Sequence, residues 1–241
     1  MPDRSDHGWW PYLLPIFAFL GLVEISGRIP DVAAPYFLFA KVVVPFGLFL
    51  YFVRRDRYPE LRGYRATAGG IALDVLVGLL GAVVWMAPYL VFDVLRPGAE
   101  EAFDPKQLGD SFVPIVLALR VTSYAVVIPF IEELFVRSWL LRYAEVFDKD
   151  TDFRDVPIAH FSRRSFLVVC VFFTLSHIQW EYPVAVLWIV GTQLWFYRRK
   201  HLVALVIVHA VTNLAIFLCV VFGSGRIRDA SGQAIDLWFF L

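Results

Sequence analysis

The 241-residue sequence predicts an all-α fold, a polytopic transmembrane helical bundle of about seven spans with a cytoplasmic N-terminus. Three observations predict it. Hydrophobic residues make up 59% of the chain and charged residues 18%, which is below the quarter or so typical of soluble domains. Seven apolar stretches approach the roughly 20 residues that a helix needs to cross the hydrocarbon. Aromatic residues gather at several ends of these stretches, as at a membrane interface.

The seven stretches follow one another along the whole chain, so we expect a single integral membrane domain over residues 1–241. We expect the first stretch to be a retained span rather than a cleaved signal, because Asp3 and Asp6 precede it and no small-residue cleavage site follows. The final residues, LWFFL, should touch lipid or pack back on the bundle. The approximate bounds of the stretches are 9–26, 34–53, 69–95, 112–146, 165–180, 183–197 and 201–222.

Basic residues in the connections predict the orientation. The connections after the second, fourth and sixth stretches are rich in Lys and Arg, which places them in the cytoplasm by the positive-inside rule. The connection after the third stretch is net acidic, and HIQWEYP has no Lys or Arg, so both should face outward. Lys+Arg and Asp+Glu balance at 22 each, and no nucleic-acid partner is therefore expected.

Charged side chains inside the spans each need a partner or a function, because burying a charge in the bilayer is costly. Glu24 and Asp93 lie near the outer ends of their spans, where water reaches them. Lys41 and Arg120 have stems long enough to snorkel, or can neutralise a carboxylate such as Asp74. For these five residues a structural role is expected.

The segment EELFVR carries the first of three polar clusters. Glu133 and Arg137 are four residues apart on a helix and can pair. Glu132 lies about 140° from Arg137 around the helical wheel and is left as the freer carboxylate. Pro129 predicts a kink just before the acidic pair, because it lacks a backbone N–H.

Two further clusters lie on later stretches. FTLSH places Phe173 and His177 on one helix face, and HAVTN does the same for His209 and Asn213. Either pair alone is typical of hydrogen bonding between membrane helices. Three clusters together predict one polar pocket, because buried His and Glu need mutual partners.

Such a pocket has the groups for hydrolysis of an acyl bond by activated water. A poorly solvated carboxylate can act as the general base, and a nearby His can hold the same water. A second His and an Asn amide offer hydrogen bonds to a developing oxyanion. No HExxH, GxGD or GxSG motif occurs, which excludes the familiar metallo, aspartyl and serine intramembrane proteases.

The three motifs, in this order on separate helices, resemble the CPBP (CAAX protease and bacteriocin-processing) family of glutamic-type intramembrane proteases. The best-known members of this family are the CAAX prenyl endopeptidases. The resemblance covers residues 112–222, which would carry the catalytic core. It implies that Glu132 activates water with help from His177, and that His209 and Asn213 stabilise the oxyanion. Supporting roles are implied for Glu133, Arg137 and Phe173.

The resemblance also implies an activity and a substrate class. The expected enzyme hydrolyses a peptide bond near the C-terminal tail of a membrane-tethered protein, the tail being a sorting or lipidated sequence. The chain is similar to the CAAX-protease-related proteins associated with exosortase systems, which suggests a bacterial inner membrane. No cofactor is implied, and zinc held by two His and two Glu is the minority alternative. A proton-coupled transporter and a non-catalytic scaffold remain the alternatives on the residues alone.

The depths of the motifs pose a geometric question. If the fourth helix enters the membrane at Ser111, Glu132 lies about 30 Å along it, near the cytoplasmic end. His177 would lie about 18 Å from that side. The two residues meet only if the fourth helix is long, tilted or kinked.

Overall fold

The computed structural model describes residues 8–30 and 33–241, and this part of the chain is all-helical, as predicted. Seven helices occupy the seven predicted stretches. Residues 1–7, which include the acidic residues behind the prediction of a retained first span, lie outside the described residues. The helices are α1 (Trp10–Ser26), α2 (Ala34–Arg54), α3 (Ala68–Val91), a long helix (Asp110–Val146), α7 (Arg163–Leu175), α8 (Tyr182–Arg199) and α9 (Leu202–Gly223).

The long helix contains two π-helical segments along its length. It passes through Pro129, which lacks a backbone N–H, and the turn before this proline is π-helical. A second π-helical segment follows the acidic pair, so wider turns lie on both sides of Glu132 and Glu133. Such segments often occur at functional sites. The segments in order are α4 (Val113–Thr122), π-helical η6 (Ser123–Val127), α5 (Ile128–Glu133), π-helical η7 (Leu134–Leu140) and α6 (Leu141–Val146).

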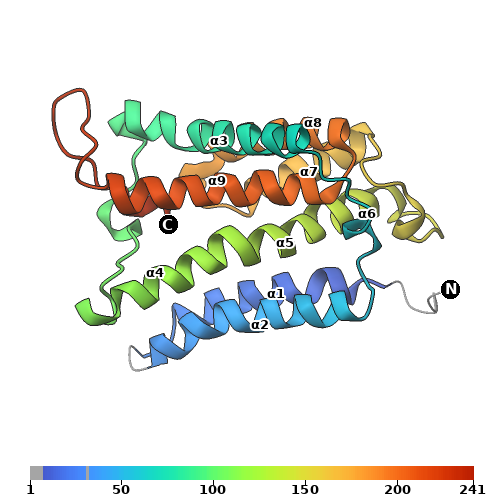
Figure 1. The fold of residues 1–241 in the computed structure, drawn as a ribbon, viewed down its shortest axis with the longest axis horizontal. Coiled ribbons are helices and arrows are strands. Elements are labelled where there is room, and N and C mark those ends of the chain that lie inside the picture. The colour runs from blue at the N-terminus through green and yellow to red at the C-terminus, as the bar shows by residue number, and fades with distance from the viewer. Residues whose placement is uncertain (1–7, 31–32) are drawn as a thin grey trace.

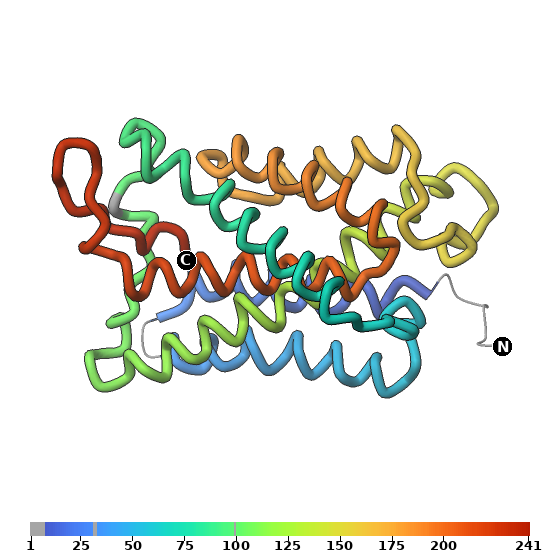
Figure 2. The backbone as a smooth tube through the Cα atoms, turned by 45° about the horizontal axis from the view of Figure 1, so that its top comes forward, coloured from blue at the N-terminus to red at the C-terminus, as the bar shows by residue number. Residues whose placement is uncertain are grey.

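The long helix lies between a pair formed by α1 and α2 and a group formed by α3, α7, α8 and α9 (Figure 1). Both views place the three basic connections, which follow α2, α6 and α8, at one end of the bundle (Figures 1 and 2). These connections therefore share a face, as the charge pattern predicts. That this face is cytoplasmic remains a prediction.

Four of the described helices are long and apolar enough to cross a membrane, namely α2, α3, the long helix and α9. Helices α1 and α7 are shorter, with 17 and 13 residues. Large apolar side chains such as Leu76, Leu80 and Val83 are exposed on α3, which suits contact with lipid rather than water. The structure thus supports an integral membrane protein, while the count of seven spans stays a prediction.

Local signals in the sequence start the helices that carry the site. The Ser162 hydroxyl accepts a hydrogen bond from the backbone N–H of Ser165 and caps α7. The ring of His201 accepts from the N–H of Val203 at the start of α9. Lys200, with a φ of 52°, adopts the left-handed conformation that ends α8, so α8 and α9 meet in a tight turn.

Helices α3 and α9 approach each other closely at two glycines. A Cβ atom on Gly78 would lie 2.7 Å from the backbone oxygen of Val208, and one on Gly81 would lie 2.7 Å from the Thr212 hydroxyl. The Thr212 hydroxyl in turn donates a hydrogen bond to the Gly78 carbonyl, and the two oxygens lie 2.9 Å apart. The absence of side chains at these two positions therefore sets how near α9 and its polar residues come to α3.

An ion pair between α3 and α8 corrects one expectation from the sequence. Asp74 is fully buried. Its carboxylate forms a bidentate ion pair with Arg199, accepting from Nε at 2.9 Å and from Nη2 at 2.8 Å. Neither Lys41 nor Arg120 neutralises it. The sequence does not indicate Arg199 as the partner, because only the packing of α3 against α8 brings Arg199 and Asp74 together.

The C-terminal tail packs back on the bundle, one of the two outcomes expected from its sequence. Phe239 and Phe240 are buried, and both lie against the ring of Tyr89 near the end of α3. This packing brings residues 239–241 to the edge of the cavity described next.

Candidate functional site

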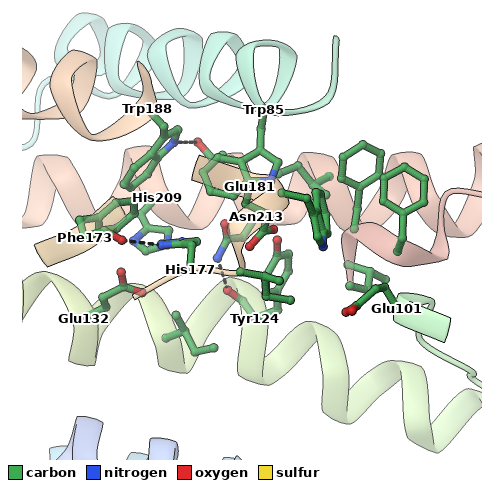
Figure 3. A pocket seen from close by; sticks show the side chains of 18 of the residues that line it. Trp85, Glu101, Tyr124, Glu132, Phe173, His177, Glu181, Trp188, His209 and Asn213 are labelled. Atoms are coloured by element: carbon green, nitrogen blue, oxygen red, sulfur yellow. Dashed lines mark hydrogen bonds between the residues drawn. The ribbon is translucent and has the colours of Figure 1, made fainter. Parts of the chain in front are cut away.

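One cavity of about 310 Å³ lies between the long helix, α7, α8 and α9 (Figure 3). Glu132, His177, His209 and Asn213 all line it, so the structure brings the four expected catalytic residues together. The length of the fourth helix answers the question of depth, because it continues from Asp110 to Val146 and its residue Glu132 lines the same cavity as His177.

Glu132 is the carboxylate that faces the cavity. It is half-buried, and within the described part of the chain its carboxylate makes no hydrogen bond or ion pair. Figure 3 shows it beside His177 and His209. The prediction that Glu132 is the freer member of the acidic pair agrees with this geometry.

Glu133 points away from the cavity into the protein. Its Oε1 atom lies 3.2 Å from Nη1 of Arg137, which confirms the predicted pairing, and both side chains are 0% exposed. The same oxygen lies 3.0 Å from Nδ1 of His209 on α9. The second contact was not predicted. It makes Glu133 the group that holds the His209 ring, because a carboxylate at Nδ1 keeps a proton there and turns Nε2 the other way.

Arg137 occupies a fully enclosed position. Besides Glu133, its guanidinium donates to the Thr192 hydroxyl on α8 at 2.8 Å. Its charged end also lies 5.6 Å from the Phe173 ring and 5.5 Å from the Trp188 ring, within the range of cation–π attraction. Arg137 therefore ties the long helix to α7 and α8 behind the cavity.

His177 lies just beyond α7, which ends at Leu175, so the expectation that it belongs to this helix is wrong by two residues. The last carbonyls of a helix lack partners from the next turn. His177 satisfies one of them, because its Nδ1–H donates to the Phe173 carbonyl at 2.7 Å. The two rings are in contact with centroids 4.5 Å apart. Both cavity histidines thus use Nδ1 for a protein partner and keep Nε2 for another contact.

Asn213 is tied to the long helix. Its side-chain amide donates to the Tyr124 carbonyl at 2.7 Å, and Tyr124 belongs to the first π-helical segment. An amide NH₂ group has two donors, so one N–H remains for a ligand in the cavity.

Aromatic side chains form the wall on the α3 and α8 side. Trp188 stacks on Phe173 with centroids 5.1 Å apart and meets His209 edge to face at 4.9 Å. Trp85 of α3 lies 5.4 Å from the His177 ring. These rings hold the two imidazoles in place and keep bulk water from that side.

The cavity also contains polar residues that the sequence does not predict to lie there, namely Glu101, Arg120, Tyr124, Glu181 and Thr212. The sequence predicts a structural or snorkelling role for Arg120 and no site role for the other four. Glu181 lies four residues after His177 in the connection between α7 and α8, a spacing that was readable in HIQWE. Burial is the main cause that raises the pKa of the Glu181 carboxyl above its ordinary value, while the nearby His177 opposes the shift.

The described residues contain no group of three or more His, Cys, Asp and Glu side chains arranged to hold a metal ion. Glu133, the carboxylate nearest to His209, already bonds to this ring and to Arg137.

In a comparison with protein families, residues 114–215 match the family described as type II CAAX prenyl endopeptidase, Rce1-like. This segment begins in α4, ends in α9 and contains every catalytic and supporting residue expected from the sequence. The match agrees with the resemblance to the CPBP family, and the exosortase association is not part of it. Neither the curated proteins nor the solved structures contain a match to the chain.

Proposed function

We propose that this chain is a CAAX-type intramembrane protease, because residues 114–215 match the family described as type II CAAX prenyl endopeptidase, Rce1-like. We propose that it hydrolyses a peptide bond near the C-terminal tail of a membrane-tethered protein, with Glu132 as the base. One observation carries the proposal. An unpaired carboxylate lies in the same cavity as two imidazoles that are both held by Nδ1.

The first step is the addition of water to the scissile carbonyl. Glu132 removes one proton from the water, the water oxygen bonds to the carbonyl carbon, and the C=O electron pair moves to the oxygen. His177 positions the water, because its Nδ1–H is committed to Phe173 and its Nε2 lone pair is free to accept the second O–H.

His209 and Asn213 would stabilise the oxyanion. Asn213 offers its remaining amide N–H. His209 would contribute through Nε2, since Glu133 holds its Nδ1, and donating to the oxyanion requires a proton on both ring nitrogens. When the tetrahedral intermediate collapses, the C–N bond breaks and Glu132 returns its proton to the leaving amine. The products are a carboxylic acid and an amine, and the enzyme is unchanged.

The substrate would be a sorting or lipidated tail. The matching family is described as a CAAX prenyl endopeptidase, which supports a prenylated CAAX tail as the first probe. An exosortase-linked sorting tail and a location in a bacterial inner membrane belong to the same proposal and rest on the sequence resemblance. No step requires a metal ion. A chelator should accordingly leave activity unchanged, and loss of activity restored by Zn²⁺ would favour the zinc alternative.

The test uses the purified protein in detergent with a fluorescent, S-farnesylated peptide that ends in a CAAX sequence. Glu132→Gln and His177→Ala should abolish cleavage while the protein remains folded and monodisperse. Glu24→Gln is the matched control, since Glu24 is exposed and, among the residues that the structure describes, pairs with Arg28 alone. Cleavage that persists in both cavity variants would refute the mechanism. Variants that fail to fold would favour the scaffold, and lost ion flux without any proteolysis would favour the transporter.

A further inference from the structure

Arg120 lines the proposed catalytic cavity and forms no ion pair with any residue that the structure describes. It lines the same cavity as Glu132 and His177 but lies on α4, about three turns earlier in the long helix. Its Nε atom is buried and has no hydrogen-bond partner. The guanidinium lies instead over two rings, 4.9 Å from the centroid of Phe103 and 5.9 Å from that of Tyr124.

Within the described part of the chain, no carboxylate lies within ion-pair distance of Arg120. Glu101 and Glu181 also line the cavity, yet neither pairs with it. The other enclosed arginines differ, because Arg137 pairs with Glu133 and Arg142 pairs with Glu60. A poorly solvated guanidinium without an anion is unfavourable, and binding an anionic ligand would relieve this cost.

We propose that Arg120 binds the free C-terminal carboxylate of the substrate and so directs cleavage to a bond close to the chain end. The inference rests on the proposed function, since it names the part of the substrate that this cavity recognises. A guanidinium has paired N–H donors in a planar fork that matches a carboxylate. The guanidinium lies over the rings of Phe103 and Tyr124, so we expect the N–H donors at its edge to bind the ligand.

The spacing between Arg120 and Glu132 sets a length. Twelve helical residues correspond to at most about 18 Å along the axis. An extended peptide covers about 3.3 Å per residue, so about five residues would fit between a carboxylate on Arg120 and a carbonyl at Glu132. The released product should therefore be a short peptide of at most about five residues, measured from the C-terminus.

The experiment compares three forms of the farnesylated peptide, namely the free acid, the C-terminal amide, and an amide whose last residue is Asp. The wild-type protein should cleave the free acid about 10- to 100-fold more efficiently than either amide, because a charged hydrogen-bonding partner is lost. Arg120→Gln should lower cleavage of the free acid to the amide level and leave the amides unaffected. The residual amide cleavage shows that the variant is folded.

Binding to the cleavage-dead Glu132→Gln protein gives a second readout that needs no turnover. The free acid should bind about 10- to 100-fold more tightly than the amide, and the added Arg120→Gln change should remove this difference. Lys149→Gln is the control, because Lys149 is an exposed cation in the connection between α6 and α7 and does not line the cavity. It should preserve the preference for the free acid.

Three results would overturn the inference. The first is equal cleavage and equal binding of acid and amide by the wild-type cavity. The second is an Asp-terminated amide that matches the free acid, which would place the recognised carboxylate on a side chain. The third is a cleavage site that stays at the same bond when residues are added to the C-terminus. Failure of the hydrolytic proposal is seen separately, as cleavage by the Glu132→Gln protein.

Discussion

The Glu133 carboxylate of the long helix and the His209 ring of α9 are joined by a 3.0 Å hydrogen bond between residues 76 positions apart. The same carboxylate oxygen receives the Arg137 guanidinium at 3.2 Å. The acidic pair is thus divided by direction, with Glu132 facing the cavity and Glu133 facing the protein interior. Glu133 both neutralises the arginine and sets the orientation of a cavity histidine.

Replacing Glu133 with Gln should lower kcat by about 10- to 100-fold, the usual effect of losing a group that orients a functional histidine. The neutral Gln amide cannot replace the anionic oxygen that accepts from Arg137 and also bonds to His209. The loss should shrink when His209 is already Ala, because both changes act through one ring. Steady-state kinetics of the two single variants and the double variant check this. Losses that simply multiply would contradict the coupling.

Arg137→Lys should destabilise the protein by about 1–3 kcal/mol, although the charge is kept. A single ammonium cannot reproduce the separate bonds to Glu133 and Thr192 together with the contacts to two rings. Chemical unfolding in detergent measures the effect. Thr192→Val is the comparison that removes one of these bonds alone, and it should cost less. A Lys variant as stable as the wild type would show that charge alone matters here.

Gly78→Ala should destabilise the bundle and reduce activity, because the new Cβ would lie 2.7 Å from the Val208 carbonyl oxygen and force α3 from α9. Gly191→Ala on α8 is the matched control, since a Cβ there meets nothing within 4 Å. The control should be neutral or more stable by up to about 1 kcal/mol, the usual helix preference of Ala over Gly. Thermal unfolding of both variants distinguishes them. Equal effects would mean that the close approach is not needed.

Glu181 should make stability depend on pH. Its pKa is raised, chiefly by burial, so the folded protein binds this proton more tightly than the unfolded chain. The stabilisation is full below the ordinary glutamate pKa of about 4.3 and is lost as the pH rises through the raised value. Glu181→Gln should remove this pH-dependent part of the free energy of unfolding, because an amide does not titrate. Thermal unfolding of both proteins between about pH 4 and 8 gives the difference curve. A flat difference would contradict the burial of this carboxylate.

Much of the site was predictable because it depends on local helical geometry. The pairing of Glu133 with Arg137 follows from a spacing of four residues, and it leaves Glu132 as the unpaired carboxylate. His177 was placed correctly in the cavity but not on its helix. The end of α7 depends on where the chain turns into α8, and the side chain of His177 takes part in that ending.

Contacts between distant segments could not be read in the same way. The bond from Glu133 to His209 requires α9 to lie against the long helix, and Arg199 reaches Asp74 across 125 positions of sequence. Arg120 looked like a snorkelling side chain because its sequence neighbours are apolar. Only the packed bundle shows that no carboxylate comes within ion-pair distance of it in the described residues.

The sequence by itself determined the all-helical fold, the order of the three polar motifs and the pairing of Glu133, rather than Glu132, with Arg137, since apolar length and helical spacing are local properties. The tertiary structure decided which residues share the cavity, how each imidazole is turned and which charges are left without partners. Those outcomes depend on the distances between helices, which are set by close approaches such as those at Gly78 and Gly81.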